Sequence, residues 1–231
     1  SSDLGLSLFP RDFVLTLPKP SNHDGTREFF GEEGRLRSQV SIIKNREAMR
    51  SRTPPEFRAG ENNLGNMPVL MDSIVDFFIT GAIKRMRGFG EQHHSMLVHT
   101  NILTPPHRNL AKGIRAFSTM IKSHYMADNW GSRTPIYDKC KKRWEDQFNI
   151  SEDQESEMDK HMKRFLNEFD PATMVRKINS KPPDSEELIQ SKNKLDYEDV
   201  PGGLKVIAVG GTILSRGLTV EGLTISYFTN N

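Results

Sequence analysis

The stretch Leu204–Phe228, L-K-V-I-A-V-G-G-T-I-L-S-R-G-L-T-V-E-G-L-T-I-S-Y-F, decides the fold. Lys205 to Val209 is a short apolar run rich in β-branched residues, which is typical of a buried parallel strand. Gly210 and Gly211 end this run, and Leu223 to Phe228 resumes a strand. Strand, glycine turn, polar loop and strand predict an α/β sheet whose ligand site lies beyond a strand's carboxyl end.

The loop after the first of these strands carries groups suited to an anionic ligand. Thr212 and Ser215 can donate hydrogen bonds to phosphate oxygens, as free backbone N–H groups also can. Gly211 lets a ligand approach the backbone closely. Arg216 could be a solvated loop arginine, but its position beyond a strand favours a functional role.

Two strings in this stretch resemble known families. L-S-R-G-L-T-V-E-G-L-T, Leu214 to Thr224, resembles motif V of superfamily-two helicases and translocases, close to the DEAH type. The longer string V-G-G-x-x-L-S-R-G-L-T-x-E-G-L-T-x-S-Y-F resembles the Z1 domain family, described as candidate endonucleases of bacterial restriction and defence systems. A second region of resemblance covers Leu8 to Gly31 and is densest at L-F-P-R-D-F and L-P-K-P-S-N, and a third covers Pro68 to Thr100.

The resemblance implies roles for individual residues. Motif V contacts both nucleic acid and nucleotide, so Arg216 would couple the two sites. Thr219 stands where many helicases carry an aspartate that meets the ribose, and Glu221 is an alternative for that contact. The implied nucleotide-binding residues are Gly217, Thr219 and Glu221. The implied nucleic-acid-binding residues are Gly211, Thr212 and Ser215, with His99 and Thr100 at the end of a motif IV strand.

Some residues have competing interpretations. His99 is equally well explained as a histidine at the edge of the core, hydrogen-bonded to backbone. His93 and His94 are adjacent, so on a strand they point apart, and no metal site is predicted there. Cys140 lies among lysines that would lower its pKa, yet without a nearby histidine it is predicted to be a plain surface thiol.

Short strands are also predicted outside the deciding stretch, from runs of β-branched and aromatic residues. They are Asp12–Leu17, Val40–Ile43, Ser95–Thr100 and Met174–Asn179.

Two long helices are predicted from apolar residues at helical spacing. The first runs from Pro68 to Arg87, with Asn66 or Met67 as its cap and Gly88 just beyond its last basic residue. The second begins at Pro105.

Between Ala127 and Asp170 the sequence changes to charged helix without strand patterning. Tyr137 to Phe148 is basic, whereas Ser151 to Phe169 is mostly acidic, and Ser151 with Gln154 has the form of a capping box. We therefore predict a helical insertion at 127–170 within an α/β domain formed by 1–126 and 171–231.

Charge and cysteine content exclude several classes of protein. The formal net charge is +2, so any surface that attracts nucleic acid must be local. One cysteine excludes a disulfide framework and fits a reducing cytoplasm. No apolar run approaches the ~18 residues of a membrane helix.

Eight basic side chains are candidates for a track along a nucleic-acid backbone, and a solvated helix face explains them equally well. They are Arg108, Lys112, Arg115, Lys122, Lys139, Lys141, Lys142 and Arg143. Nuclease chemistry is not supported, because Pro183-Asp184 is followed by no Glu-x-Lys at a workable distance.

The sequence thus predicts a RecA-like parallel sheet flanked by helices, the second such domain of a superfamily-two ATPase acting on DNA in restriction or phage defence. The phosphate loop and Walker B acids are not found in these 231 residues. ATP and magnesium would therefore serve a longer cytoplasmic protein, and this chain alone would not hydrolyse ATP. Its partners would be DNA, a first RecA-like domain and other defence subunits. An interaction scaffold and an endonuclease module remain the alternatives.

Overall fold

The computed structural model describes residues 24–43, 64, 67–99, 104–127, 134–178, 195–211 and 220–229. The chain forms two compact units, Ser1–Ile42 and Ile43–Asn231. None of the described helices is both long enough and apolar enough to cross a membrane.

The first unit contains helix α1, Thr26–Phe30, and the 3-10 turn η1, Arg37–Gln39. The Glu28 carboxylate accepts a hydrogen bond from the Gly25 N–H at 2.8 Å, which caps the start of α1. The strand predicted at Val40–Ile43 is wrong, because these residues form no strand and Ile42 is 89% exposed. A strand needs a neighbouring strand for its backbone hydrogen bonds, and none of the described strands pairs with this run.

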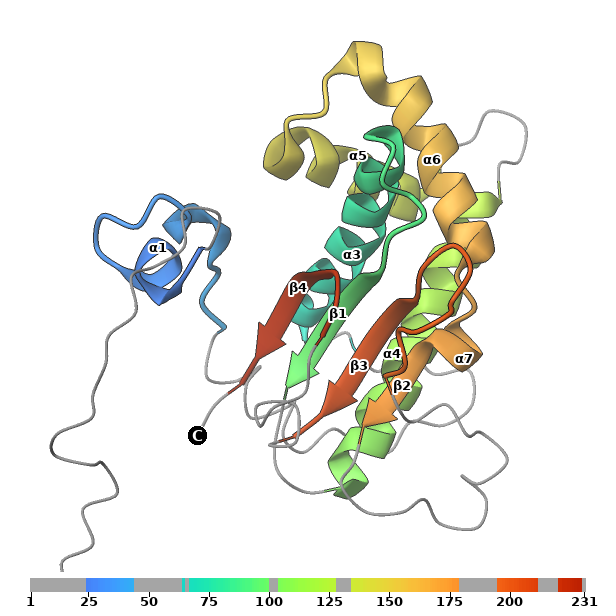
Figure 1. The fold of residues 1–231 in the computed structure, drawn as a ribbon. Helices are drawn as coiled ribbons and strands as arrows, with labels where there is room; N and C mark the ends of the chain where they lie inside the picture. The colour runs from blue at the N-terminus through green and yellow to red at the C-terminus, as the bar shows by residue number, and fades with distance from the viewer. Residues whose placement is uncertain are drawn as a thin grey trace, which may run out of the picture. The chain divides into compact units, whose positions relative to one another are not determined.

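The second unit is built on a four-stranded parallel sheet. Its strands are β1 His94–His99, β2 Val175–Ile178, β3 Lys205–Gly210 and β4 Leu223–Phe228. They are ordered β2-β3-β1-β4, and every pairing is parallel (Figure 1). The predicted α/β class with a parallel sheet is confirmed, and the arrangement is consistent with a RecA-like domain. β3 is interior and buried throughout, as its unbroken apolar run predicts.

Helices flank this sheet. They are α3 Pro68–Met86, α4 Thr104–Met126, α5 Pro135–Phe148, α6 Glu155–Glu168 and the short α7 Pro171–Met174. Both long predicted helices are confirmed. Met67 is the N-cap residue of α3, but its side chain makes no capping hydrogen bond. Gly88 lies just beyond the C-terminal end of the helix and has a φ of 83°.

The predicted helical region 127–170 contains α5, the 3-10 turn η3 (Glu152–Gln154) and α6, without a strand among its described residues. The Ser151–Gln154 capping box forms as predicted. These helices share the main core with the sheet, because Trp144, Met158 and Phe165 are buried in the same apolar cluster as Phe77 of α3. The helical region is therefore packed into the domain.

The two faces of the sheet are covered differently. One face packs against α3 and α4, which lie behind the sheet in the view of Figure 1, and α5 and α6 complete this large cluster. The other face carries a small cluster whose described residues come from the strands and from the segment that leads into β3. Its members are Ile178, Leu195, Leu204, Val206 and Ala208, with Leu97, Tyr197, Val200 and Val220 packed against them.

Candidate functional site

The carboxyl ends of the four strands meet at one edge of the sheet, which we call the carboxyl edge. His99 of β1 pairs with Gly210 of β3 on one side and with Phe228 of β4 on the other. Ile178 of β2 pairs with Gly210 in turn. The last residues of all four strands thus form one row, and ligands of open parallel sheets bind beyond this kind of edge.

His99 is held in this row by packing and by backbone. It is 6% exposed, and its ring stacks on that of Phe228 with centroids 4.3 Å apart and planes 16° from parallel. Its carbonyl oxygen accepts a hydrogen bond from the Thr229 N–H at 3.0 Å. This burial favours the core-edge interpretation of His99, while its contact with nucleic acid stays a prediction.

Gly211 is buried directly after β3, at the same edge. Strand β3 extends one residue further than predicted, since Gly210 still pairs with its neighbours. The other predicted residues of the loop and of the motif IV strand end lie outside the described residues. They are Thr100, Thr212, Ser215, Arg216, Gly217 and Thr219.

Glu221 lies at the opposite edge of the sheet, which we call the amino edge. Its carbonyl oxygen accepts a hydrogen bond from the Ser95 hydroxyl at 2.7 Å, and its carboxylate lies 3.6 Å from Nε2 of His93. Ser95 and His99 are four residues apart on β1, so the two edges are separated by about 13 Å. The structure therefore does not bring Glu221 together with His99 and Gly211.

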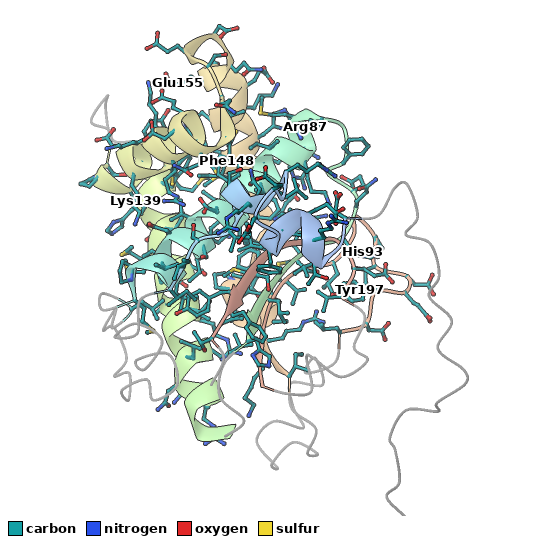
Figure 2. All side chains as sticks on the ribbon, turned by 90° about the vertical axis from the view of Figure 1, so that its left-hand side faces the viewer. Arg87, His93, Lys139, Phe148, Glu155 and Tyr197 are labelled. Atoms are coloured by element: carbon teal, nitrogen blue, oxygen red, sulfur yellow. The ribbon has the colours of Figure 1, made fainter. Side chains whose placement is uncertain are left out.

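A polar cluster that the sequence did not predict closes the amino edge. The Tyr197 hydroxyl lies 3.1 Å from the Ser95 hydroxyl, and its ring meets that of His93 edge to face at 5.0 Å. Figure 2 shows His93 and Tyr197 side by side. Nδ1 of His93 accepts a hydrogen bond from the Leu204 N–H at 2.9 Å. These contacts fasten the starts of β1, β3 and β4 to one another.

His94 anchors the same edge from the other face of β1. It is 1% exposed and stacks on Phe77 at 4.6 Å. Phe77 O lies 2.8 Å from Nε2 and can only accept, so Nε2 carries the proton, and Nδ1 accepts from the Thr224 hydroxyl at 2.9 Å. Desolvation by burial lowers the pKa of His94 to about 4, so the ring is neutral at neutral pH.

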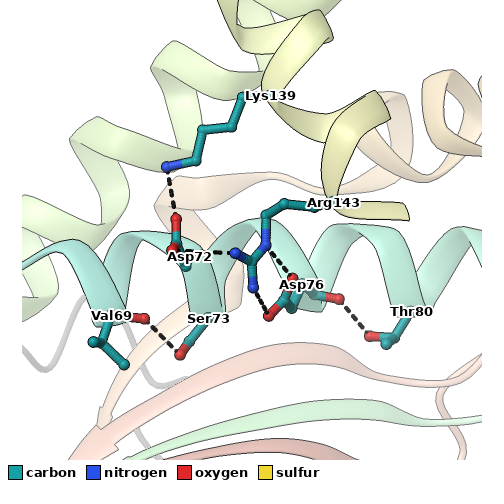
Figure 3. Close-up of polar contacts among 7 residues, drawn as sticks. All are labelled: Val69, Asp72, Ser73, Asp76, Thr80, Lys139 and Arg143. Carbon is teal, nitrogen blue, oxygen red and sulfur yellow. Dashed lines mark hydrogen bonds and ion pairs between the residues drawn. The ribbon is translucent and has the colours of Figure 1, made fainter. Parts of the chain in front are cut away.

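Five of the eight basic side chains are engaged in contacts within the fold. Arg143 makes two hydrogen bonds to the Asp76 carboxylate, at 2.6 and 2.7 Å, and Lys139 pairs with Asp72 at 2.7 Å, which joins α5 to α3 (Figure 3). Burial raises the pKa of Asp76, against the opposing effect of Arg143.

The other three of these five side chains also make contacts within the fold. Arg115 donates to the carbonyl of Val175 at 2.7 Å, and Lys122 donates to the carbonyl of Phe169 at 3.1 Å. Lys141 pairs with Glu155 at 2.6 Å. These five side chains therefore tie elements of the fold to one another, a role that the sequence analysis did not predict. Arg108, Lys112 and Lys142 are exposed.

The prediction for Cys140 is wrong in two respects. Its side chain is fully buried in the main cluster on α5, where the sequence predicted a surface thiol. Desolvation by burial raises its pKa to about 12, and this outweighs the lowering effect of Lys139 and Arg143. The thiol is therefore a packed apolar group and no nucleophile.

Phe228 is the residue at the carboxyl edge that sequence reasoning missed. The sequence did contain a signal for it. Ile225 and Tyr227 alternate along β4 and face the main cluster, so the next residue, Phe228, is a large aromatic on the other face, where a polar residue would be expected. Only the pairing shows that this extra ring meets His99.

The family model of the Z1 domain matches residues 69–231. This match spans the whole sheet and both edges, and the chain belongs to the Z1 domain family. Comparison with curated proteins and with solved structures gives no significant match.

Proposed function

We propose that this Z1 domain acts on DNA as one domain of a helicase-like, ATP-dependent protein in bacterial restriction or phage defence. The observation that carries the proposal is the course of the motif V-like segment. It leaves β3 at Gly211 on the carboxyl edge, beside His99 and Phe228, and it reaches β4 at Glu221 on the amino edge. A segment that begins at the ligand-binding edge of a parallel sheet is well placed to contact a bound polyanion.

In this proposal the chain contributes the backbone contacts to DNA. Hydroxyls and N–H groups donate to phosphate oxygens and position the strand without reading its sequence. Arg216 couples this contact to the nucleotide. The contributing residues are His99, Thr100, Gly211, Thr212 and Ser215 for DNA, and Gly217 and Thr219 for the nucleotide. Glu221 is left out of this set, because its carboxylate faces His93 at the amino edge.

ATP and magnesium are shared with a partner domain of the RecA-like type. We assign the magnesium ion and the phosphate chain of ATP to the partner domain, because the phosphate loop and Walker B acids that would hold them are not found in these 231 residues. Other defence subunits are further partners, and the cytoplasm is the proposed location.

The first test is DNA binding by the chain itself. Labelled single-stranded and duplex DNA are titrated at several salt concentrations, and we expect weak binding without sequence preference that is lost at moderate salt. The log–log slope should be shallow, since each neutralised phosphate adds about 0.7 to 0.9. Arg216→Ala should weaken binding. Its control is Arg164→Ala, which removes the same charge from an exposed position on α6.

The second test separates the proposal from its alternatives. The chain is incubated with DNA and magnesium or manganese and run on a denaturing gel, and phosphate release from ATP is assayed in parallel. We expect neither cleavage nor phosphate release from the chain alone. Metal-dependent nicking would support the endonuclease alternative, and a complete lack of DNA binding at low salt would support an interaction scaffold.

The third test concerns coupling. In a protein that joins this domain to a nucleotide-binding partner domain, Arg216→Ala should leave the melting temperature unchanged and abolish the stimulation of ATPase activity by DNA. Wild-type stimulation at unchanged stability would contradict the coupling role.

A further inference from the structure

Phe228 has the properties of a binding residue. It is the last residue of the edge strand β4 and is 46% exposed, although its neighbour Tyr227 is buried in the main cluster. A phenylalanine loses considerable free energy by remaining in contact with water. Single exposed apolar residues are normal on a protein surface, so the case for a binding role rests on where this ring lies, at the ligand-binding edge of the sheet and stacked on His99.

His99 fixes the orientation of this ring. The two residues are direct cross-strand partners on adjacent parallel strands, and their rings are 16° from parallel at 4.3 Å. The backbone beneath them is also held, because the Thr229 N–H donates to the carbonyl of His99 and Thr229 is buried. His99 covers one face of the Phe228 ring, so the opposite face is the flat apolar surface through which the ring can meet a ligand.

We propose that Phe228, supported by His99, stacks on a base of single-stranded DNA. This inference rests on the proposed function and adds a base contact to the phosphate contacts assigned above. A preoriented aromatic ring can hold a single strand, because every base has a flat face and stacking is tolerant of sequence. Bases within a duplex are already stacked, so the site favours single-stranded DNA over duplex.

The same strand offers a matched control. Leu223, the first residue of β4, is also 46% exposed, but it lies at the amino edge and is aliphatic. If exposure of apolar surface on β4 were enough to attract DNA, both positions would contribute. If a flat ring at the carboxyl edge is required, only Phe228 will contribute.

The test measures the affinity of the chain for three labelled ligands at low salt: a single-stranded oligonucleotide, an abasic strand of equal length, and a duplex. Phe228→Leu keeps an apolar side chain but removes the flat face. It should weaken binding of the single strand by about fivefold, the low end of what removing one stacking aromatic causes, and leave binding of the abasic strand unchanged. Phe228→Trp should restore the affinity, and its fluorescence should be quenched by the single strand but not by the abasic one. Leu223→Ala should bind all three ligands as the wild type does.

Several outcomes would overturn the inference. Equal losses by Phe228→Leu on the normal and abasic strands would show that no base is stacked. Wild-type affinity of Phe228→Leu for every ligand, with the wild type still binding DNA, would reject the stacking site and leave the proposed function standing. Failure of the wild type to bind any of the three ligands would reject both. Circular dichroism and melting of each variant confirm that the fold is retained.

Discussion

The two edges of one parallel sheet are built for different purposes. At the amino edge, Tyr197 contacts both His93 and Ser95, and the Ser95 hydroxyl also donates to the carbonyl of Glu221. At the carboxyl edge β1 ends in a buried histidine, β4 in a half-exposed phenylalanine, and β3 in Gly210, which Gly211 follows. The amino edge therefore uses its polar groups to hold the fold, whereas in our proposal the carboxyl edge presents its residues to a ligand.

This difference follows from the parallel arrangement. A connection between two parallel strands must leave from one edge and return to the other. The motif V-like segment obeys this rule, since it begins at Gly211 and ends where Ser95 N donates to the carbonyl of Gly222 at 2.9 Å. Fixing the return point at the amino edge leaves the departure point free to take part in binding.

The largest expected effect on stability comes from Gly222, which precedes β4 at the amino edge and whose carbonyl accepts a hydrogen bond from the Ser95 N–H. Its φ is 63°, and a Cβ there would overlap the main chain of His93. Gly222→Ala combines backbone strain with a clash against backbone that cannot move, so we expect a loss of about 4 kcal/mol in the free energy of unfolding, measured with urea.

Gly88→Ala is the matched control for that variant. Gly88 has φ 83° with nothing within 4 Å of the added Cβ, so the substitution isolates the backbone cost, about 1 kcal/mol. Similar losses in both variants would contradict the close packing of Gly222 on His93.

The next effect is a pH dependence that arises from His94. Burial lowers its folded-state pKa to about 4 from the ordinary 6.5, so as the pH falls the unfolded chain takes up the proton first. Stability present above pH 6.5 is thus lost between pH 6.5 and 4, and at about 1.4 kcal/mol per pKa unit the loss is on the order of 3 kcal/mol. Urea unfolding across this range should show the decline, and His94→Gln should flatten it by that amount. An unaltered pH profile in the variant would mean that folding does not lower the pKa of His94.

A smaller effect is expected at Tyr197. Tyr197→Phe removes the hydroxyl that meets Ser95, and one such hydrogen bond contributes about 1 kcal/mol. DNA affinity should not change, because the contact lies at the edge away from the proposed site. A double-mutant cycle with Ser95→Ala measures the pair directly. Additive losses in the cycle would contradict the hydrogen bond between Ser95 and Tyr197. Weakened DNA binding by Tyr197→Phe would contradict the division between the edges.

The smallest effect on stability is expected at the carboxyl edge. Phe228→Leu keeps an apolar side chain at a half-exposed position, so its free energy of unfolding should change by about 0.5 kcal/mol or less. Phe228→Leu should thus lose DNA affinity but little stability, whereas Tyr197→Phe should lose stability but no DNA affinity. A loss of stability several times larger would show that the His99–Phe228 stack is part of the core.

Several elements were predictable because their signals are local. Lys205 to Val209 is β-branched and apolar without interruption, and such a run has few options other than a buried strand. The helix from Pro68 and the capping box at Ser151 follow from spacing and from hydrogen bonds between near neighbours in sequence. Val40 to Ile43 has the same local signal, but none of the strands that the structure describes pairs with it, and the prediction was wrong for that reason.

The family and the parallel α/β class were thus determined by the sequence alone, through a strand run and a specific string of residues. Tertiary structure decided what each polar or reactive group does. Cys140 is buried because α5 packs against α3, and five basic side chains became internal ties because carboxylates and carbonyls from distant segments meet them. Glu221 and His99 lie at opposite edges, although both belong to stretches that resemble helicase motifs. The reason is physical: hydrophobic periodicity is a property of neighbouring residues, whereas burial, charge pairing and position along a sheet depend on contacts between segments far apart in sequence.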